Sequence, residues 1–338
     1  MDSHSLLLTV LIILIALGFD FINGFHDSAN SIATVVSTRV LPPRYAVMWA
    51  AGFNFAAILL GGAHVAMTVG TGIIDPGVVE NVLILSALLG AIIWNLITWW
   101  FGLPSSSSHA LIGGLLGAGL VKGGASALVW KGIIKTAAFI VLSPTIGLLL
   151  GLFLMIVVLN LSRNSTVSQA DRVFRRLQLF SAAVYSLGHG MNDAQKTMGI
   201  IAVVLFSGGY LGSTFYIPWW VVVSCYLFIA LGTMMGGWRI VKTLGTKITK
   251  LQPIGGFCAE TAAAVSIIGA SFGGIPVSTT HTITGAVMGV GATKRLTAVR
   301  WGVATSIIWA WILTIPITAA ISAGLFLLIR FIFPGESL

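Results

Sequence analysis

The segment Gly102-Leu-Pro-Ser-Ser-Ser-Ser-His109 recurs 172 residues later as Gly274-Ile-Pro-Val-Ser-Thr-Thr-His281. When the comparison is extended to Gly119 and Gly291, the two copies are identical at 7 of 18 positions. Pro and Ser/Thr are typical of the first residues of helices. Each copy therefore predicts a helical hairpin whose chain reverses around Pro104 or Pro276.

Two further motifs recur in the same order. Leu60-Gly-Gly, followed by Thr68-Val-Gly-Thr71, resembles Met235-Gly-Gly, followed by Thr243-Leu-Gly-Thr246, at an offset of 175. Gly24-Phe-His-Asp27 resembles Gly190-Met-Asn-Asp193 at an offset of 166. Because order and spacing are both preserved, the chain is interpreted as two repeats. We expect a first repeat over residues 1–160, a cytoplasmic linker over 161–178 and a second repeat over 179–338.

The composition places both repeats in a membrane. Of the 338 residues only 8% are charged and 57% are hydrophobic, with a mean hydropathy of +1.00. Soluble domains carry about 25% charged residues. A soluble enzyme is therefore excluded, and so is a nucleic-acid binder, because the basic residues form no long run. Apolar segments along the whole length predict an all-α polytopic membrane protein with closely packed or broken helices.

The distribution of basic residues tests the orientation of the two repeats. A hairpin returns the chain to the side from which it came, so each repeat crosses the membrane an odd number of times and the second is inverted. Of the 18 Lys and Arg residues, this topology places 13 inside, 4 outside and one, Lys196, within the membrane. The excess inside follows the positive-inside rule. We therefore expect a multi-pass protein of the cell (plasma) membrane with both termini extracytoplasmic.

Inverted repeats with interrupted helices are typical of secondary transporters, whose sites lie near the midplane between the halves. The chain contains no Gly-x-x-x-x-Gly-Lys-Ser/Thr phosphate loop, and its longest hydrophilic stretch is too short for an ATPase domain. Transport driven by an ion or substrate gradient is the expected function. No nucleophile–base pair or metal cluster emerges, so we expect no enzymatic activity and no cofactor.

Four acidic residues fall within apolar segments, namely Asp20, Asp27, Asp193 and Glu260. An ionised side chain at the bilayer centre costs at least about 2.5 kcal/mol on insertion scales, so such residues mark ion paths by default. Gly24 is expected to let its helix unwind, which would expose carbonyls to a small cation. The expected cation-binding or coupling residues are Asp20, Asn23, Asp27, Asn30, Asn192, Asp193 and Glu260. A Na⁺ site, if there is one, is expected at Asp27, Asn30 and Asp193.

Lys196 stands three residues after Asp193, where the first repeat has Asn30 three residues after Asp27. A buried lysine there pairs with Asp193 in place of a bound cation, or contacts an anionic substrate. The sequence leaves both alternatives open.

The two hairpin tips are the expected anion site. The N–H groups and positive dipole end of a helix N-terminus bind anions, and hydroxyl groups add donors. Two tips from opposed halves can enclose a small tetrahedral oxyanion. The residues assigned to it are Ser105, Ser106, Ser107, Ser108, Ser278, Thr279 and Thr280. His109 and His281 are expected to orient the tips, and Trp309 and Trp311 are interpreted as interfacial anchors.

Taken together, these motifs resemble the PiT family of inorganic phosphate transporters. The resemblance rests on Asp20-Phe-Ile-Asn-Gly-Phe-His-Asp-Ser-Ala-Asn30, His189-Gly-Met-Asn-Asp193 and the two Pro-Ser/Thr-His tips, and it spans essentially the whole chain. It implies symport of inorganic phosphate with Na⁺ or H⁺, with the cation near Asp27 and phosphate at the tips. Many relatives have an acid where this chain has Asn54, and the resemblance makes Glu260 the counterpart of that position in the other half. Many relatives have Asn where this chain has Lys196.

The sequence therefore predicts a phosphate:cation symporter that works by alternating access. Some relatives carry sulfate, so sulfate symport is the alternative within this fold, and an anion channel is the alternative from another class. The choice between Na⁺ and H⁺, the stoichiometry and transport of a metal–phosphate complex are left open. No sequence pattern indicates a subunit interface, so a homodimer is also left open.

Overall fold

The computed structural model describes residues 3–333 and is built from helices over that range. The first half comprises α1 (Ser3–Ser37), α2 (Pro43–Ala56), the short helix η1 (Ala57–Leu60), α3 (His64–Gly72), η2 (Pro76–Val78), α4 (Asn81–Phe101), α5 (Ser107–Gly123), η3 (Gly124–Ala127) and α6 (Trp130–Leu161). The second half comprises α7 (Val167–Ser207), α8 (Trp219–Met235), α9 (Trp238–Lys242), η4 (Thr243–Lys247), α10 (Pro253–Phe272), α11 (Thr279–Ala292), η5 (Leu296–Ala298) and α12 (Trp301–Ile332). Within the described range an isolated bridge between Ile74 and Leu128 is the sole β-type pairing.

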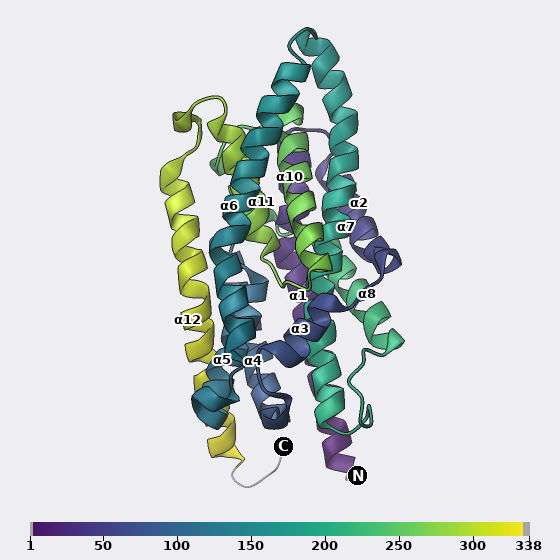
Figure 1. Cartoon of the computed structure of the whole chain (residues 1–338), viewed down its shortest axis with the longest axis vertical. Helices are drawn as coiled ribbons and strands as arrows, with labels where there is room; N and C mark the ends of the chain where they lie inside the picture. The colour runs from purple at the N-terminus through teal and green to yellow at the C-terminus, as the bar shows by residue number, and fades with distance from the viewer. Residues whose placement is uncertain (1–2, 334–338) are drawn as a thin grey trace.

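The two halves contain the same elements in the same order. Each has a long first helix, a second element that is broken, a hairpin of two helices and a long last helix. The bend between α2–η1 and α3 is 85°, and the bend between α8 and α9–η4 is 61°. The α6–α7 connection lies at the upper end of Figure 1, while the start of α1 and the end of α12 both lie at the lower end. α1 and α7 therefore run in opposite directions, as inverted halves require.

The hairpin turns follow directly from the motif that defines them. Gly102 ends α4 in the left-handed conformation with φ of 64°, and Gly274 follows α10 with φ of 63°. Leu103 N donates to Thr98 O at 2.8 Å, and Ile275 N donates to Ala270 O at 2.9 Å, which closes both helix ends in the same way. Glycine takes this conformation without steric cost. The predicted hairpins are therefore confirmed, and each next helix starts within five residues of its glycine.

Each hairpin packs against the last helix of the other half, α5 against α12 and α11 against α6. Small residues permit the close approach. A Cβ atom at Gly117 would lie 2.0 Å from the carbonyl oxygen of Ala319, and one at the equivalent Gly289 would lie 2.1 Å from that of Leu148. The glycines shared by the two copies of the motif therefore join the halves, as in tightly packed membrane helices.

The broken second element of each half also contacts the hairpin of the other half. Thr68 Oγ1 donates to Gly274 O at 2.7 Å, and its repeat equivalent Thr243 donates to Gly102 O at 2.9 Å. These two threonines occupy equivalent positions in the two copies of the second repeated motif, at an offset of 175. Each broken element therefore places a threonine hydroxyl at the glycine in the hairpin turn of the other half.

Six helices are long and apolar enough to cross a membrane, or up to eight when each bent pair counts as one span; this refers to the part of the chain that the structure describes. The chain is thus an all-α multi-pass membrane protein. Most of the expected linker is helical, because α7 already begins at Val167 and residues 162–166 alone separate it from α6. The outermost residues of the predicted repeats, 1–2 and 334–338, lie outside the described range.

One prediction about the first helix is wrong. α1 does not unwind at Gly24 but continues to Ser37. A Cβ atom at Gly24 would lie 2.1 Å from the carbonyl oxygen of Ile229 on α8. The missing side chain therefore serves close helix packing instead of a break, and the breaks occur in the second element of each half.

Candidate functional site

The two hairpin tips meet the polar turns of α1 and α7 in the interior of the molecule. α4 and α5 occupy the lower part of Figure 1, and α10 and α11 the upper part, so the tips approach from opposite ends. Ser107 Oγ donates to Asp27 Oδ1 at 3.3 Å. In the other half, Thr279 Oγ1 donates to Asp193 Oδ2 at 3.4 Å. Each carboxylate is thus bound by the tip of its own half, through residues that are equivalent in the repeat.

A second pair of contacts crosses between the halves. Asn30 Nδ2 on α1 donates to Thr280 Oγ1 of the second tip at 2.8 Å. The equivalent residue on α7, Lys196, donates to Ser108 Oγ of the first tip. The tips, α1 and α7 therefore form one cluster with approximate twofold symmetry, and Asn30 against Lys196 is its main chemical asymmetry.

The centre of the cluster contains three groups that can bind a cation. Ligand atoms of Asp27, His189 and Asp193 all lie within 4.8 Å of one another. Asp27, Asp193 and Lys196 are at most 2% exposed, and the facing tip residues Ser107, Ser108, Thr279 and Thr280 at most 3%. The structure therefore shows the cluster occluded from both ends of the molecule.

Each of the two carboxylates has a histidine beside it, His26 next to Asp27 and His189 next to Asp193. His26 Nδ1 lies 2.8 Å from Asp27 Oδ1, and its Nε2 lies 3.1 Å from Thr98 Oγ1. His189 Nε2 lies 3.5 Å from Asp193 Oδ2. Neither histidine is among the predicted site residues, although both adjoin the recurring Asp motifs.

The remaining tip residues divide by role. Ser106 and Ser278 are the N-caps of α5 and α11, where each Oγ accepts from the backbone N–H of His109 or His281 at 3.2 Å. Ser105 lies to one side, where its hydroxyl donates to Thr98 Oγ1 at 2.8 Å. Of the seven residues assigned to the anion, Ser107 and Thr279 therefore contact the carboxylates, and Ser108 and Thr280 contact Lys196 and Asn30.

The two tips touch through their histidines. The rings of His109 and His281 are 4.6 Å apart, and His281 stacks on Trp311 at 3.9 Å. Trp311 is 5% exposed, and its Nε1 donates to Pro104 O at 3.0 Å. The interpretation of Trp311 as an interfacial anchor is therefore wrong, whereas Trp309, two residues earlier, is 58% exposed. A helical offset of two residues turns one side chain inward and the other outward.

Two of the expected coupling residues, Asp20 and Asn192, make their hydrogen bonds outside the central cluster. Asp20 is two helical turns before Asp27 and accepts from Thr197 Oγ1 at 2.9 Å. Asn23 is buried on the same helix, at 1% exposure. Asn192 Nδ2 donates to Ser271 Oγ at 2.8 Å and to Ile275 O at 3.2 Å, which ties α7 to the second hairpin.

Glu260 also lies apart from the central cluster. Its carboxylate accepts from Gln178 Nε2 at 3.0 Å and from Ser181 Oγ at 2.5 Å, both on α7. The prediction that Glu260 and Asn54 are counterparts in the two halves is wrong. Glu260 is on the hairpin helix α10, whereas Asn54 is on α2, which belongs to the broken second element. Asn54 instead contacts His189, with Oδ1 3.1 Å from Nδ1.

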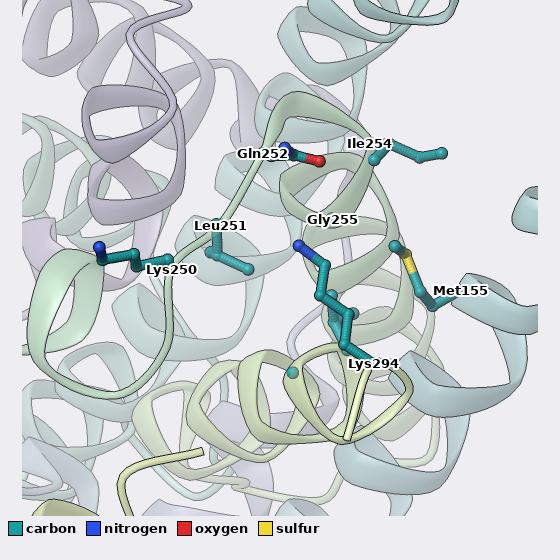
Figure 2. A pocket seen from close by; sticks show the side chains of 9 residues that line it. Met155, Lys250, Leu251, Gln252, Ile254, Gly255 and Lys294 are labelled. Carbon is teal, nitrogen blue, oxygen red and sulfur yellow. The ribbon is translucent and has the colours of Figure 1, made fainter. Parts of the chain in front are cut away.

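The structure contains two small hollows. One is lined by residues that include Met155, Lys250, Gly255 and Lys294, and none of the predicted site residues lines it. Figure 2 shows Lys294 extending into it and Lys250 pointing away. The other is lined by Asn30, Thr284 and six further residues of α1, η4 and α11. This second hollow therefore reaches the central cluster.

Comparisons with known proteins agree with this architecture. The chain matches the phosphate transporter family (PHO4) over residues 23–170 and again over 162–322. It is 63% identical over 316 residues to a "probable low-affinity inorganic phosphate transporter" of Rhizobium meliloti (strain 1021), covering 94% of this chain and 95% of that one. A protein of the same name from Bacillus subtilis (strain 168) is 46% identical over 97% of this chain and 99% of its own.

A solved structure is similar over nearly the whole fold. It is named "The sodium-dependent phosphate transporter", and it superposes with a TM-score of 0.87 at 27% identity. The alignment covers 96% of this chain and all of that one.

Proposed function

This chain belongs to the phosphate transporter family, and on that basis we propose that it imports inorganic phosphate by symport with Na⁺ or H⁺. It is a transport protein, and relatives at 63% and 46% identity are named as transporters, not as enzymes. The observation that carries the proposal is the meeting of two carboxylates, Asp27 and Asp193, with two helix N-termini inside one occluded cluster.

The tips supply the donors for phosphate. The first N–H groups of a helix have no partner within it. Those of His109 and His281 are taken by the capping serines, which leaves the N–H groups of Ser107, Ser108, Thr279 and Thr280. Together with the positive ends of two helices, these groups suit a small oxyanion.

The carboxylates supply the coupling. An anion between the tips would lie beside Asp27 and Asp193, and like charges repel strongly where water is excluded. A cation bound at the Asp27, His189 and Asp193 cluster offsets this repulsion, so phosphate binds well only together with the cation. Such mutual dependence is the requirement for symport.

Alternating access is supported by the occluded cluster and by the hollow beside Asn30. The hollow is lined by residues of α1, α11 and η4, including Leu244, and its α1 residues follow Asp27 toward the C-terminal end of that helix. α1 runs toward the side of the molecule that carries the α6–α7 connection (Figure 1). The predicted orientation makes that side cytoplasmic, with both termini extracytoplasmic in the plasma membrane. In this proposal, movement of η4 away from α1 releases phosphate and the cation into the cell.

Uptake by the purified protein in proteoliposomes tests the proposal. With phosphate outside, we expect accumulation above the outside concentration under an inward Na⁺ gradient or an inward H⁺ gradient, and equilibration without either. The two gradients are imposed separately, so that the coupling cation is identified. Accumulation that ignores both gradients, or simple equilibration under each of them, contradicts symport.

Thr279→Val is expected to raise the KM for phosphate about 10-fold to 100-fold. The substitution keeps the side-chain shape but removes a buried hydroxyl, and a hydrogen bond to a charged group contributes about 1.5–3 kcal/mol. Thr279→Ser keeps the hydroxyl and serves as the control, with a KM within a few-fold of the unmodified protein. An unchanged KM in Thr279→Val removes Thr279 from the phosphate site.

A further inference from the structure

Lys196 is the buried basic residue of the central cluster, and its contacts decide between the two roles left open by the sequence. Its Nζ donates to Asp193 Oδ1 at 2.6 Å, to Val277 O at 2.9 Å and to Ser108 Oγ. A lysine ammonium has three N–H donors. All three are therefore engaged with protein oxygens, and none is left for phosphate in this arrangement.

The three oxygens come from three separate parts of the fold. Asp193 lies on α7, Ser108 on the first hairpin tip, and Val277 in the turn that precedes α11. They comprise a carboxylate, a hydroxyl and a backbone carbonyl, which are the oxygen types that bind hard cations. The ammonium therefore has the oxygen environment of a bound cation and links both hairpins to α7.

The equivalent position in the other half lacks this charge. Asn30 contributes a neutral amide that donates to Thr280, and Asp27 is left with contacts to Ser107 and His26. The two carboxylates thus differ, because Asp193 pairs with the ammonium of Lys196, whereas the basic neighbour of Asp27 is the His26 imidazole.

We propose that the Lys196 ammonium replaces one exchangeable coupling cation, so that this transporter couples phosphate to one fewer cation than a symmetric site would. Asp27 then receives the mobile cation, while Asp193 is neutralised permanently. The inference rests on the proposed function for its transport consequences, although the binding site itself can be tested without transport.

Lys196→Asn restores the symmetry and is expected to create a Na⁺ site from Asp193, Ser108, Val277 and the new amide. The ratio of ²²Na⁺ to phosphate taken up in proteoliposomes is expected to rise by one. Lys131→Asn makes the same exchange at an exposed position of α6 and should leave the ratio unchanged. An unchanged ratio in Lys196→Asn overturns the inference. A KM for phosphate raised more than tenfold at an unchanged ratio identifies Lys196 as a phosphate ligand instead.

A binding measurement separates this inference from the proposed function. In detergent without phosphate, NaCl is expected to raise the Tm of Lys196→Asn more than that of the unmodified protein, with choline chloride as the control salt. Equal shifts overturn the inference even when transport is normal. If the unmodified protein does not accumulate phosphate, the proposed function fails, and the Tm comparison still decides the role of Lys196.

The converse variant covers a failure of Lys196→Asn to fold. Asn30→Lys places a second ammonium beside Asp27 and Thr280. It is expected to lower the cation-to-phosphate ratio by one and to remove the stimulation of uptake by the coupling gradient. Uptake that keeps the original ratio and gradient dependence in Asn30→Lys contradicts the inference.

Discussion

Replacing Asp27 by Asn is expected to lower gradient-driven phosphate uptake at least about 100-fold. The Asp27 carboxylate is 2% exposed and belongs to the group of three side chains that can bind a cation. The amide has nearly the same shape, so the hydrogen bond from Ser107 can be kept while the negative charge is lost. A 100-fold loss corresponds to about 2.7 kcal/mol, which is modest for a buried charged contact. Initial rates of uptake in proteoliposomes measure the effect.

Asp171→Asn is the matched control for this variant. Asp171 pairs with Arg175 on α7, where its side chain is 45% exposed, and exposed pairs of this kind contribute little. Its uptake is expected to stay within about twofold of the unmodified protein. Equal uptake by Asp27→Asn and Asp171→Asn, at equal amounts of reconstituted protein, excludes Asp27 from the coupling site.

Replacing Gly24 by Ala is expected to cause a large loss of folded protein. The added Cβ atom would lie 2.1 Å from Ile229 O and 2.9 Å from the carbonyl carbon, so α1 and α8 have to separate along their contact. Overpacking typically costs about 1–3 kcal/mol, and a clash with backbone leaves less room to relax. Thermal unfolding in detergent and the yield of monodisperse protein measure the loss.

Gly18→Ala on the same helix is the matched control. No atom outside its own helix and neighbours lies within 4 Å of a Cβ atom at Gly18. Alanine is favoured over glycine in a helix by about 0.5–1 kcal/mol. The Tm of Gly18→Ala is therefore expected to equal or exceed that of the unmodified protein. A Tm for Gly24→Ala as high as that for Gly18→Ala shows that α1 does not pack against α8 as described.

The hairpins could be predicted because their determinants are local. Gly102, Pro104 and Ser106, with their copies at 274, 276 and 278, end one helix, reverse the chain and start the next. The side-chain chemistry of the tips could also be predicted, since four of the seven assigned hydroxyl residues contact the polar side chains of α1 and α7 in the central cluster.

The contacts between segments that are distant in the sequence could not be predicted in the same way. Gly24 has the features of a helix break until Ile229 is placed against it. Trp311 has the composition of an interfacial residue until it stacks on His281. In both cases the partner lies on another helix, α8 for Gly24 and α11 for Trp311. A pattern of neighbouring residues in the sequence cannot predict such a contact.

The sequence alone determined a helical membrane protein of two repeats, with the hairpins and the recurring acidic motifs. These features depend on apolar composition, helix caps and internal similarity, which are properties of neighbouring residues. Tertiary structure decided which of these groups meet. Asp27 and Asp193 come together with both tips, Glu260 does not, and the three donors of Lys196 find three oxygens on separate elements. The physical reason is that a buried charge is stabilised by groups close in space, and in this fold those groups lie on elements that are far apart in the sequence.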